Sequence, residues 1–116
     1  MAKRKYLVLF RSQPTGGQPG PSPEQMQQMF AAYNAWKEKF KDAIFDMGDQ
    51  LKSEGRVVTA SGVADGPFVE VKEVVGGYMI VSAENFDRAE EVVRACPAVH
   101  AKGASLEIRE MTGAKM

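Results

Sequence analysis

The residues best suited to chemistry gather near the middle of the chain, around an Asp-Gly-Pro-Phe segment. Asp65 stands directly before Gly66 and Pro67. A partly buried carboxylate beside such a turn can act as a general base. The same residue types are also what a tight turn requires on structural grounds alone. The sequence therefore predicts Asp65 as a candidate catalytic base and leaves a purely structural role open.

Polar residues able to hold a ligand lie on both sides of this segment. Lys72, Glu73 and Tyr78 follow it closely in the chain. Adjacent residues on an extended segment point to opposite sides, so only one of Lys72 and Glu73 can face a given cleft. Arg11 ends an early apolar run, where a guanidinium can clamp an anionic group or simply mark the end of a strand. These four residues are the predicted ligand-binding set.

His100 is the single histidine and Cys96 the single cysteine of the chain. His100 is predicted as a catalytic group only if the fold brings it near Asp65, because its ordinary pKa lies near neutrality. Cys96 excludes an internal disulfide and is read as a small buried hydrophobe, or as a nucleophile if a base lies beside it. Zinc sites use three or four protein ligands, and one histidine with one cysteine does not supply them, so no metal is predicted. The glycines between 16 and 20 lack the lysine and hydroxyl pair of a phosphate loop, and no cofactor is predicted.

Length, charge and the distribution of apolar residues limit the number of domains and the kinds of partner expected for this chain. The 116 residues, taken as one domain over 1–116, suffice for a single core. Fifteen basic residues balance fifteen acidic ones, which argues against a nucleic-acid partner. The apolar run Tyr6–Phe10 is too short for a signal peptide or a membrane span. We therefore expect a cytoplasmic protein without a membrane partner.

The first half of the chain predicts a strand and a long helix. Tyr6–Phe10 is apolar on both alternating faces, as in a strand covered on both sides. Ser22, Pro23 and Gln25 form a helix start with a capping serine. Apolar residues three or four apart then predict a helix to Ser53 with a break near Gly48. They are read as core residues: Met26, Met29, Tyr33, Trp36, Phe40, Ile44, Met47 and Leu51.

The second half predicts further strands and one helix. Turn residues dominate 61–68, and 69–72 is either a short half-exposed strand or an irregular connection. Gly76-Gly77 predicts a turn or bulge. A helix is expected to begin at the cap Asn85 and to bury Phe86, Ala89, Val93 and Cys96 before Pro97 ends it. The predicted strands are Arg56–Ala60, Tyr78–Val81 and Ala104–Arg109.

This order of elements is typical of an α+β fold of the ferredoxin-like, split βαβ type. In that fold both helices cover one face of an antiparallel sheet. The strands at Tyr6 and Tyr78 are expected in its centre, and their second faces are apolar as well. One domain has nothing left to cover that second face, so we expect a second copy to pack on it as a homodimer.

Several motifs, spread over nearly the whole chain, resemble the DGPF branch of the YCII-related (YciI-like) family. The resemblance implies a dimeric α+β barrel with a cleft near the dimer interface, and it implies little about the reaction. The motifs that carry it are Asp65-Gly66-Pro67-Phe68, Val71-Lys72-Glu73, Gly76-Gly77-Tyr78, Cys96-Pro97 and Leu106-Glu107-Ile108-Arg109.

The chain departs from the family at one pair of positions. Family members outside this branch are thought to use a histidine on the first helix and an aspartate before the proline after the second. The predicted first helix holds no histidine, and Cys96 precedes Pro97. That pair is not carried over to this chain.

Two functions remain open. The first is a protein that binds a small polar molecule in a cleft near the homodimer interface, with any catalysis undecided. The second is a non-catalytic dimeric module for regulation or assembly, of the type found beside sigma factors. An enclosed pocket of a few hundred Å³, with Asp65 and another titratable group converging on it, favours the first.

Overall fold

The computed structural model describes residues 3–12, 22–52, 54–65, 74–101 and 103–113. In that part of the chain no helix is long and apolar enough to cross a membrane. The elements, in chain order, are β1 (Arg4–Ser12), α1 (Pro23–Lys39), β2 (Ile44–Gln50), β3 (Arg56–Thr59), β4 (Gly62–Asp65), β5 (Val74–Ala83), α2 (Phe86–Arg94), the 3₁₀ turn η1 (Pro97–His100) and β6 (Ala104–Glu110).

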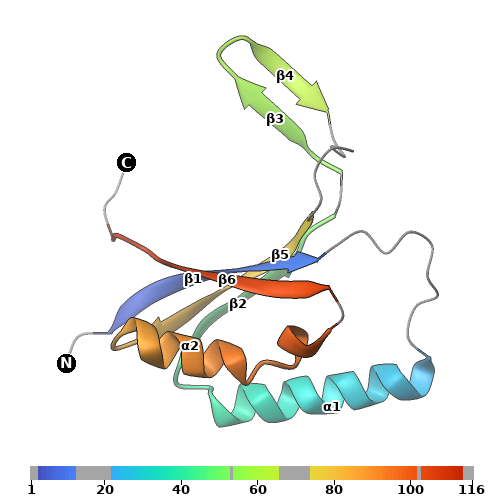
Figure 1. Cartoon of the computed structure of the whole chain (residues 1–116), viewed down its shortest axis with the longest axis vertical. Coiled ribbons are helices and arrows are strands. Elements are labelled where there is room, and N and C mark those ends of the chain that lie inside the picture. Colours follow the sequence, from blue (N-terminus) through green and yellow to red (C-terminus); the bar gives the residue numbers. More distant parts are fainter. Residues whose placement is uncertain (1–2, 13–21, 53, 66–73, 102, 114–116) are drawn as a thin grey trace.

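The main sheet has four antiparallel strands in the order β2-β5-β1-β6. Both helices and η1 lie on one face of it (Figure 1). This is the ferredoxin-like α+β arrangement that the order of elements predicted. As expected, the strands that contain Tyr6 and Tyr78 occupy the two central positions. We call the face that carries the helices the inner face and the opposite one the outer face.

The core fills the space between the inner face and the helices. Trp36 of α1 lies in its centre, and its indole N–H donates a 2.9 Å hydrogen bond to the carbonyl of Val92 on α2. This bond ties the two helices together while satisfying a buried polar group. The buried side chains are Tyr6, Val8, Trp36, Phe40, Ala43, Met79, Val81, Ala83, Ala89, Val92, Val93 and Cys96.

Helix α1 begins as predicted. The Ser22 hydroxyl accepts a hydrogen bond from the amide of Gln25, and the Gln25 side chain accepts one from the amide of Ser22. The predicted continuation to Ser53 is wrong, because α1 ends at Lys39. The first turns of the apolar stripe, with Met26 and Met29, are exposed rather than buried.

The segment after α1 is an edge strand of the main sheet. β2 pairs with β5, with Ile44 opposite Val81 and Asp49 opposite Tyr78. Gly48, the expected helix break, has φ +64° within this strand. A Cβ atom there would lie 1.9 Å from the Tyr78 carbonyl oxygen, so glycine permits the close approach of β2 to β5.

The strand predicted at Arg56–Ala60 exists as β3, but it does not join the main sheet. β3 pairs with β4 in a separate two-stranded hairpin, in which Val58 stands opposite Val63. Part of the segment predicted as turn, Gly62–Asp65, is therefore a strand. The prediction for 69–72 lies outside the described residues.

The remaining sequence signals correspond to structure. Opposite β1 the pairing of β5 skips Gly76, which is the predicted bulge. Asn85 caps α2 by accepting a hydrogen bond from the amide of Arg88. Of the residues expected on its buried side, Phe86 is instead 48% exposed, although its ring packs edge-on against Tyr6. The predicted last strand is β6.

Candidate functional site

The outer face of the main sheet combines an apolar centre with a charged border. Leu9 stands opposite Tyr78 on β5 and opposite Glu107 on β6, so the three side chains share one face. Leu7 and Ile80 form a second such pair one step along the sheet. All five of these residues are only half-buried. We call Leu7, Leu9, Tyr78 and Ile80 the outer apolar strip.

An ion pair borders this strip. Arg11 continues the outward alternation of β1, and its Nε lies 2.9 Å from Glu107 Oε1. Both side chains remain about one-third exposed. A pair this open to water contributes little to stability, up to about 1 kcal/mol. Its position beside the strip nevertheless leaves a guanidinium, a carboxylate and the Tyr78 phenol on one surface.

The structure thus brings together two of the predicted site residues, Arg11 and Tyr78. Asp65 is the last residue of β4, in the hairpin on the outer side of the sheet, and its side chain is outside the description (Figure 1). Lys72 and Glu73 lie outside the described residues. His100 ends η1 on the inner side, together with the helices. The sheet therefore separates η1 from the β3–β4 hairpin.

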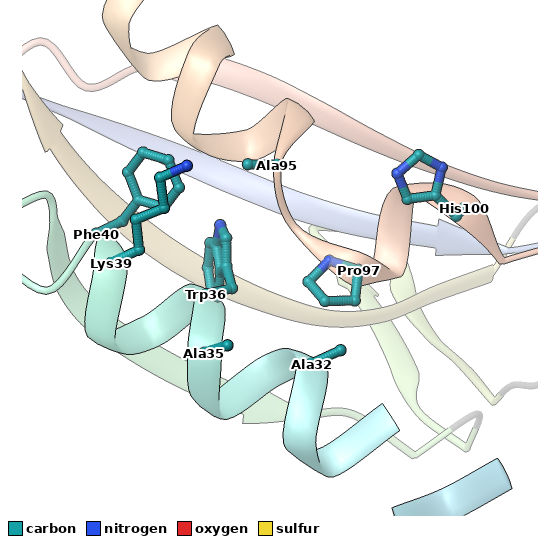
Figure 2. Close-up of a pocket in the computed structure, with 8 residues that line it drawn as sticks. All are labelled: Ala32, Ala35, Trp36, Lys39, Phe40, Ala95, Pro97 and His100. Carbon is teal, nitrogen blue, oxygen red and sulfur yellow. The ribbon is translucent and has the colours of Figure 1, made fainter. Parts of the chain in front are cut away.

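His100 lines a groove between α1 and the segment after α2 (Figure 2). The groove holds about 380 Å³, and Lys39 and His100 are its only polar lining residues. Trp36 forms its middle, while Lys39 leans over the ring of Phe40. The other lining residues are Ala32, Ala35, Ala95 and Pro97.

A second hollow of about 230 Å³ lies at the other end of the helix layer. It is lined by Lys3, Asp42, Ala43, Ser82, Ala83, Glu84 and Arg88. Neither hollow is lined by Arg11 or Tyr78. Within the described part of one copy, these two hollows therefore do not include the two predicted ligand-binding residues whose side chains the structure places.

Sequence reasoning missed one contact, between Tyr33 of α1 and Cys96. The two side chains lie close enough for each to affect the pKa of the other. Burial, with a smaller contribution from Cys96, raises the pKa of Tyr33 to about 12. Burial also raises the pKa of the Cys96 thiol, partly offset by hydrogen bonds with Ala98 and Tyr33. A thiol held protonated in this way is a poor nucleophile.

This pair lies on the first helix and before the proline, where the resemblance noted above puts a histidine and an aspartate in family members outside the DGPF branch. Tyr33 belongs to α1, and Cys96 directly precedes Pro97. Both groups stay neutral at pH 7 because their raised pKa values lie well above it. The pair therefore supplies neither the base nor the cation of a His-Asp dyad. The helical spacing of Tyr33 with Trp36 was the only sequence signal for this inward position.

Metal ligation finds no support in the part of the chain that the structure describes. No three His, Cys, Asp or Glu side chains gather there in a way that could hold an ion. On the outer face, the Arg11 guanidinium instead donates a hydrogen bond to the Glu107 carboxylate.

The comparisons with known proteins agree with this architecture. The family model for the YCII-related domain matches residues 5–112, from the start of β1 to just beyond β6. No curated protein matches the chain. The match is to the family as a whole, and the DGPF branch stays a prediction. Because the match spans all elements of the fold, the chain belongs to the YCII-related domain family.

Proposed function

We propose that the chain acts as a homodimer, built on the outer sheet face, that binds a small polar molecule in a cleft beside the interface. The observation that carries this proposal is the outer apolar strip. Its four side chains lie side by side at the centre of the sheet, while both helices lie on the other face. Burial of apolar surface contributes roughly 25 cal/mol per Å², so a matching face of a second copy stabilises the pair.

The charged border gives the proposed cleft its chemistry. Arg11 presents a planar guanidinium suited to a carboxylate or phosphate, and Glu107 holds it in position. Tyr78 adds an aromatic face and a hydroxyl within the strip. We therefore propose an anionic group on the ligand, held by Arg11, next to a body that contacts Tyr78. Asp65, Lys72 and Glu73 remain proposed contributors, with Asp65 as the base if a reaction occurs.

His100 has no part in this cleft. It lies on the inner side of the sheet, in the groove beside Trp36. One observation on the described residues favours the alternative, a non-catalytic dimeric module for regulation or assembly: neither hollow of the single copy is lined by Arg11 or Tyr78. The two functions share the dimer and differ in the cleft.

The dimer is tested with Leu9→Asp, which places a charge in the middle of the apolar strip. We expect this variant to sediment as a monomer while retaining its circular dichroism spectrum. Phe30→Asp is the matched control, since Phe30 is 62% exposed on α1. The control should remain dimeric. If the Leu9→Asp protein remained dimeric, this result would contradict the proposal that the outer face is the dimer interface.

The cleft is tested by nuclear magnetic resonance with acetate, succinate and benzoate as probes. At least one probe should shift the amide signals around Arg11 and Tyr78, and Arg11→Gln should abolish the shift. Arg94→Gln is the control on α2, where Arg94 pairs with Glu90. Asp65→Asn should weaken binding without dissociating the dimer. An intact dimer that responds to none of the probes would favour the non-catalytic module.

A further inference from the structure

The β3–β4 hairpin exposes three valine side chains to solvent. Val58 and Val63 stand opposite each other on one of its faces and are 73% and 61% exposed. Val57 is 46% exposed on the other face. Residues 57–64 carry no charged side chain at all. Such a surface is typical of an interaction site.

The hairpin also lacks support from its own chain in the described structure. β3 and β4 make extended contacts only with each other among the described elements. A single two-stranded hairpin is marginally stable in water, and stability needs further strands or a packing partner. At the tip, the hydroxyls of Thr59 and Ser61 share a hydrogen bond, and the Thr59 hydroxyl donates to the Gly62 carbonyl; these bonds fix the turn but do not cover the valines.

The direction of the hairpin indicates its partner. It projects from the outer side of the sheet, opposite the helices (Figure 1). A second copy packed on the outer face, as proposed above, would meet it there. A dimer with a two-fold axis through the outer face places each hairpin beside the other copy. The uncharged valine surface matches the outer apolar strip rather than the Arg11–Glu107 border.

We infer that the hairpin is a dimerisation arm that packs Val58 and Val63 on the outer sheet face of the second copy. The inference rests on the homodimer proposed above, and it adds the hairpin of the second copy to the proposed cleft. The arm of one copy covers the outer face of the other, so each cleft contains residues from both copies. The Asp65 end of the arm is thereby anchored at the interface.

Photochemical cross-linking tests the arm directly. p-Benzoylphenylalanine is introduced at position 58, and copies with ¹⁴N and ¹⁵N are mixed, irradiated and digested. We expect mixed-isotope cross-links from position 58 to peptides that contain Leu7, Leu9, Tyr78 or Ile80. The same photoreactive residue at position 30, on α1, should give no cross-link to those peptides. Val58→Asp should raise the dissociation constant of the dimer at least about tenfold.

The outcomes separate this inference from the proposed function. If Val58→Asp leaves the dissociation constant unchanged and cross-links join only residues of the same copy, the arm is overturned while the dimer stands. Cross-links to the helix layer of the second copy would also overturn it. If the unmodified protein is a monomer and Leu9→Asp has no effect on its mass, both the proposed dimer and the proposed arm are contradicted.

Discussion

The position of Gly48 in β2 requires glycine. Its φ of +64° is left-handed, and a Cβ atom would meet the Tyr78 carbonyl oxygen at 1.9 Å. Gly48→Ala must therefore push β2 away from β5 as well as strain its own backbone. We expect the free energy of unfolding to fall by about 2 kcal/mol or more, measured by urea denaturation.

A matched control for this substitution is Gly55→Ala. Gly55 has no positive φ and has open space where the Cβ atom would lie. The stability of that variant should stay within about 0.5 kcal/mol of the parent. Equal effects of the two substitutions would contradict the described contact between β2 and β5.

Tyr33 should contribute to the pH dependence of the free energy of unfolding at alkaline pH. Its pKa is raised from 10.0 to about 12, so between these values the unfolded state has lost a proton that the folded state keeps. The free energy of unfolding must therefore fall as the pH rises through this interval, and the contribution is complete below pH 10. Tyr33→Phe should make the alkaline decline shallower.

The measurement is a stopped-flow ultraviolet titration of folded protein, comparing the parent with Tyr33→Phe. The difference between the two curves should show one phenol that ionises near pH 12. A difference curve centred at the ordinary tyrosine pKa would show that Tyr33 is not buried beside Cys96.

At the scale of elements, the N-terminus of α1 depends on a reciprocal cap. Ser22 and Gln25 each satisfy an amide of the other through bonds of 3.2 and 2.9 Å. Ser22→Ala removes the acceptor for the Gln25 amide, and we expect a loss of about 1 kcal/mol in urea denaturation. Ser105→Ala on β6, where Ser105 is exposed, should cost less. A larger loss at Ser105 would contradict the cap.

The sequence predicted well the elements whose signals are local. The cap at Ser22, the cap at Asn85 and the bulge at Gly76 all depend on neighbours within a few residues. The course of the chain after Phe40 does not. Spacings of three and four continue through Ile44 and Met47, so they fit a helix although the chain is a strand. Pairing of β2 with β5 overrides this local preference.

The candidate site was predictable only in its residue types. Arg11 and Tyr78 are 67 positions apart in the sequence, and the register of β1 with β5 and β6 brings them to one surface. No spacing in the sequence specifies that register. The contact of Tyr33 with Cys96 depends in the same way on the packing of α1 beside η1. His100 is a catalytic candidate only if it lies near Asp65, and the sheet lies between η1, which ends at His100, and β4, which ends at Asp65.

At the scale of the whole molecule, the outer side of the sheet carries apolar side chains that the core does not include. Its core lies entirely between the inner face and the helices, while the outer apolar strip and the valines of the hairpin share the other side. In the proposed homodimer, a second copy on that side would cover both surfaces at once and create the cleft at their margin. The cleft, the arm and the proposed ligand all depend on this single association.

Sedimentation equilibrium of the unmodified chain at micromolar concentration tests that association most directly. We predict a single species with twice the 12.7 kDa mass of one copy, independent of loading concentration. A species of 12.7 kDa throughout the same range would contradict the covered outer face and, with it, the cleft.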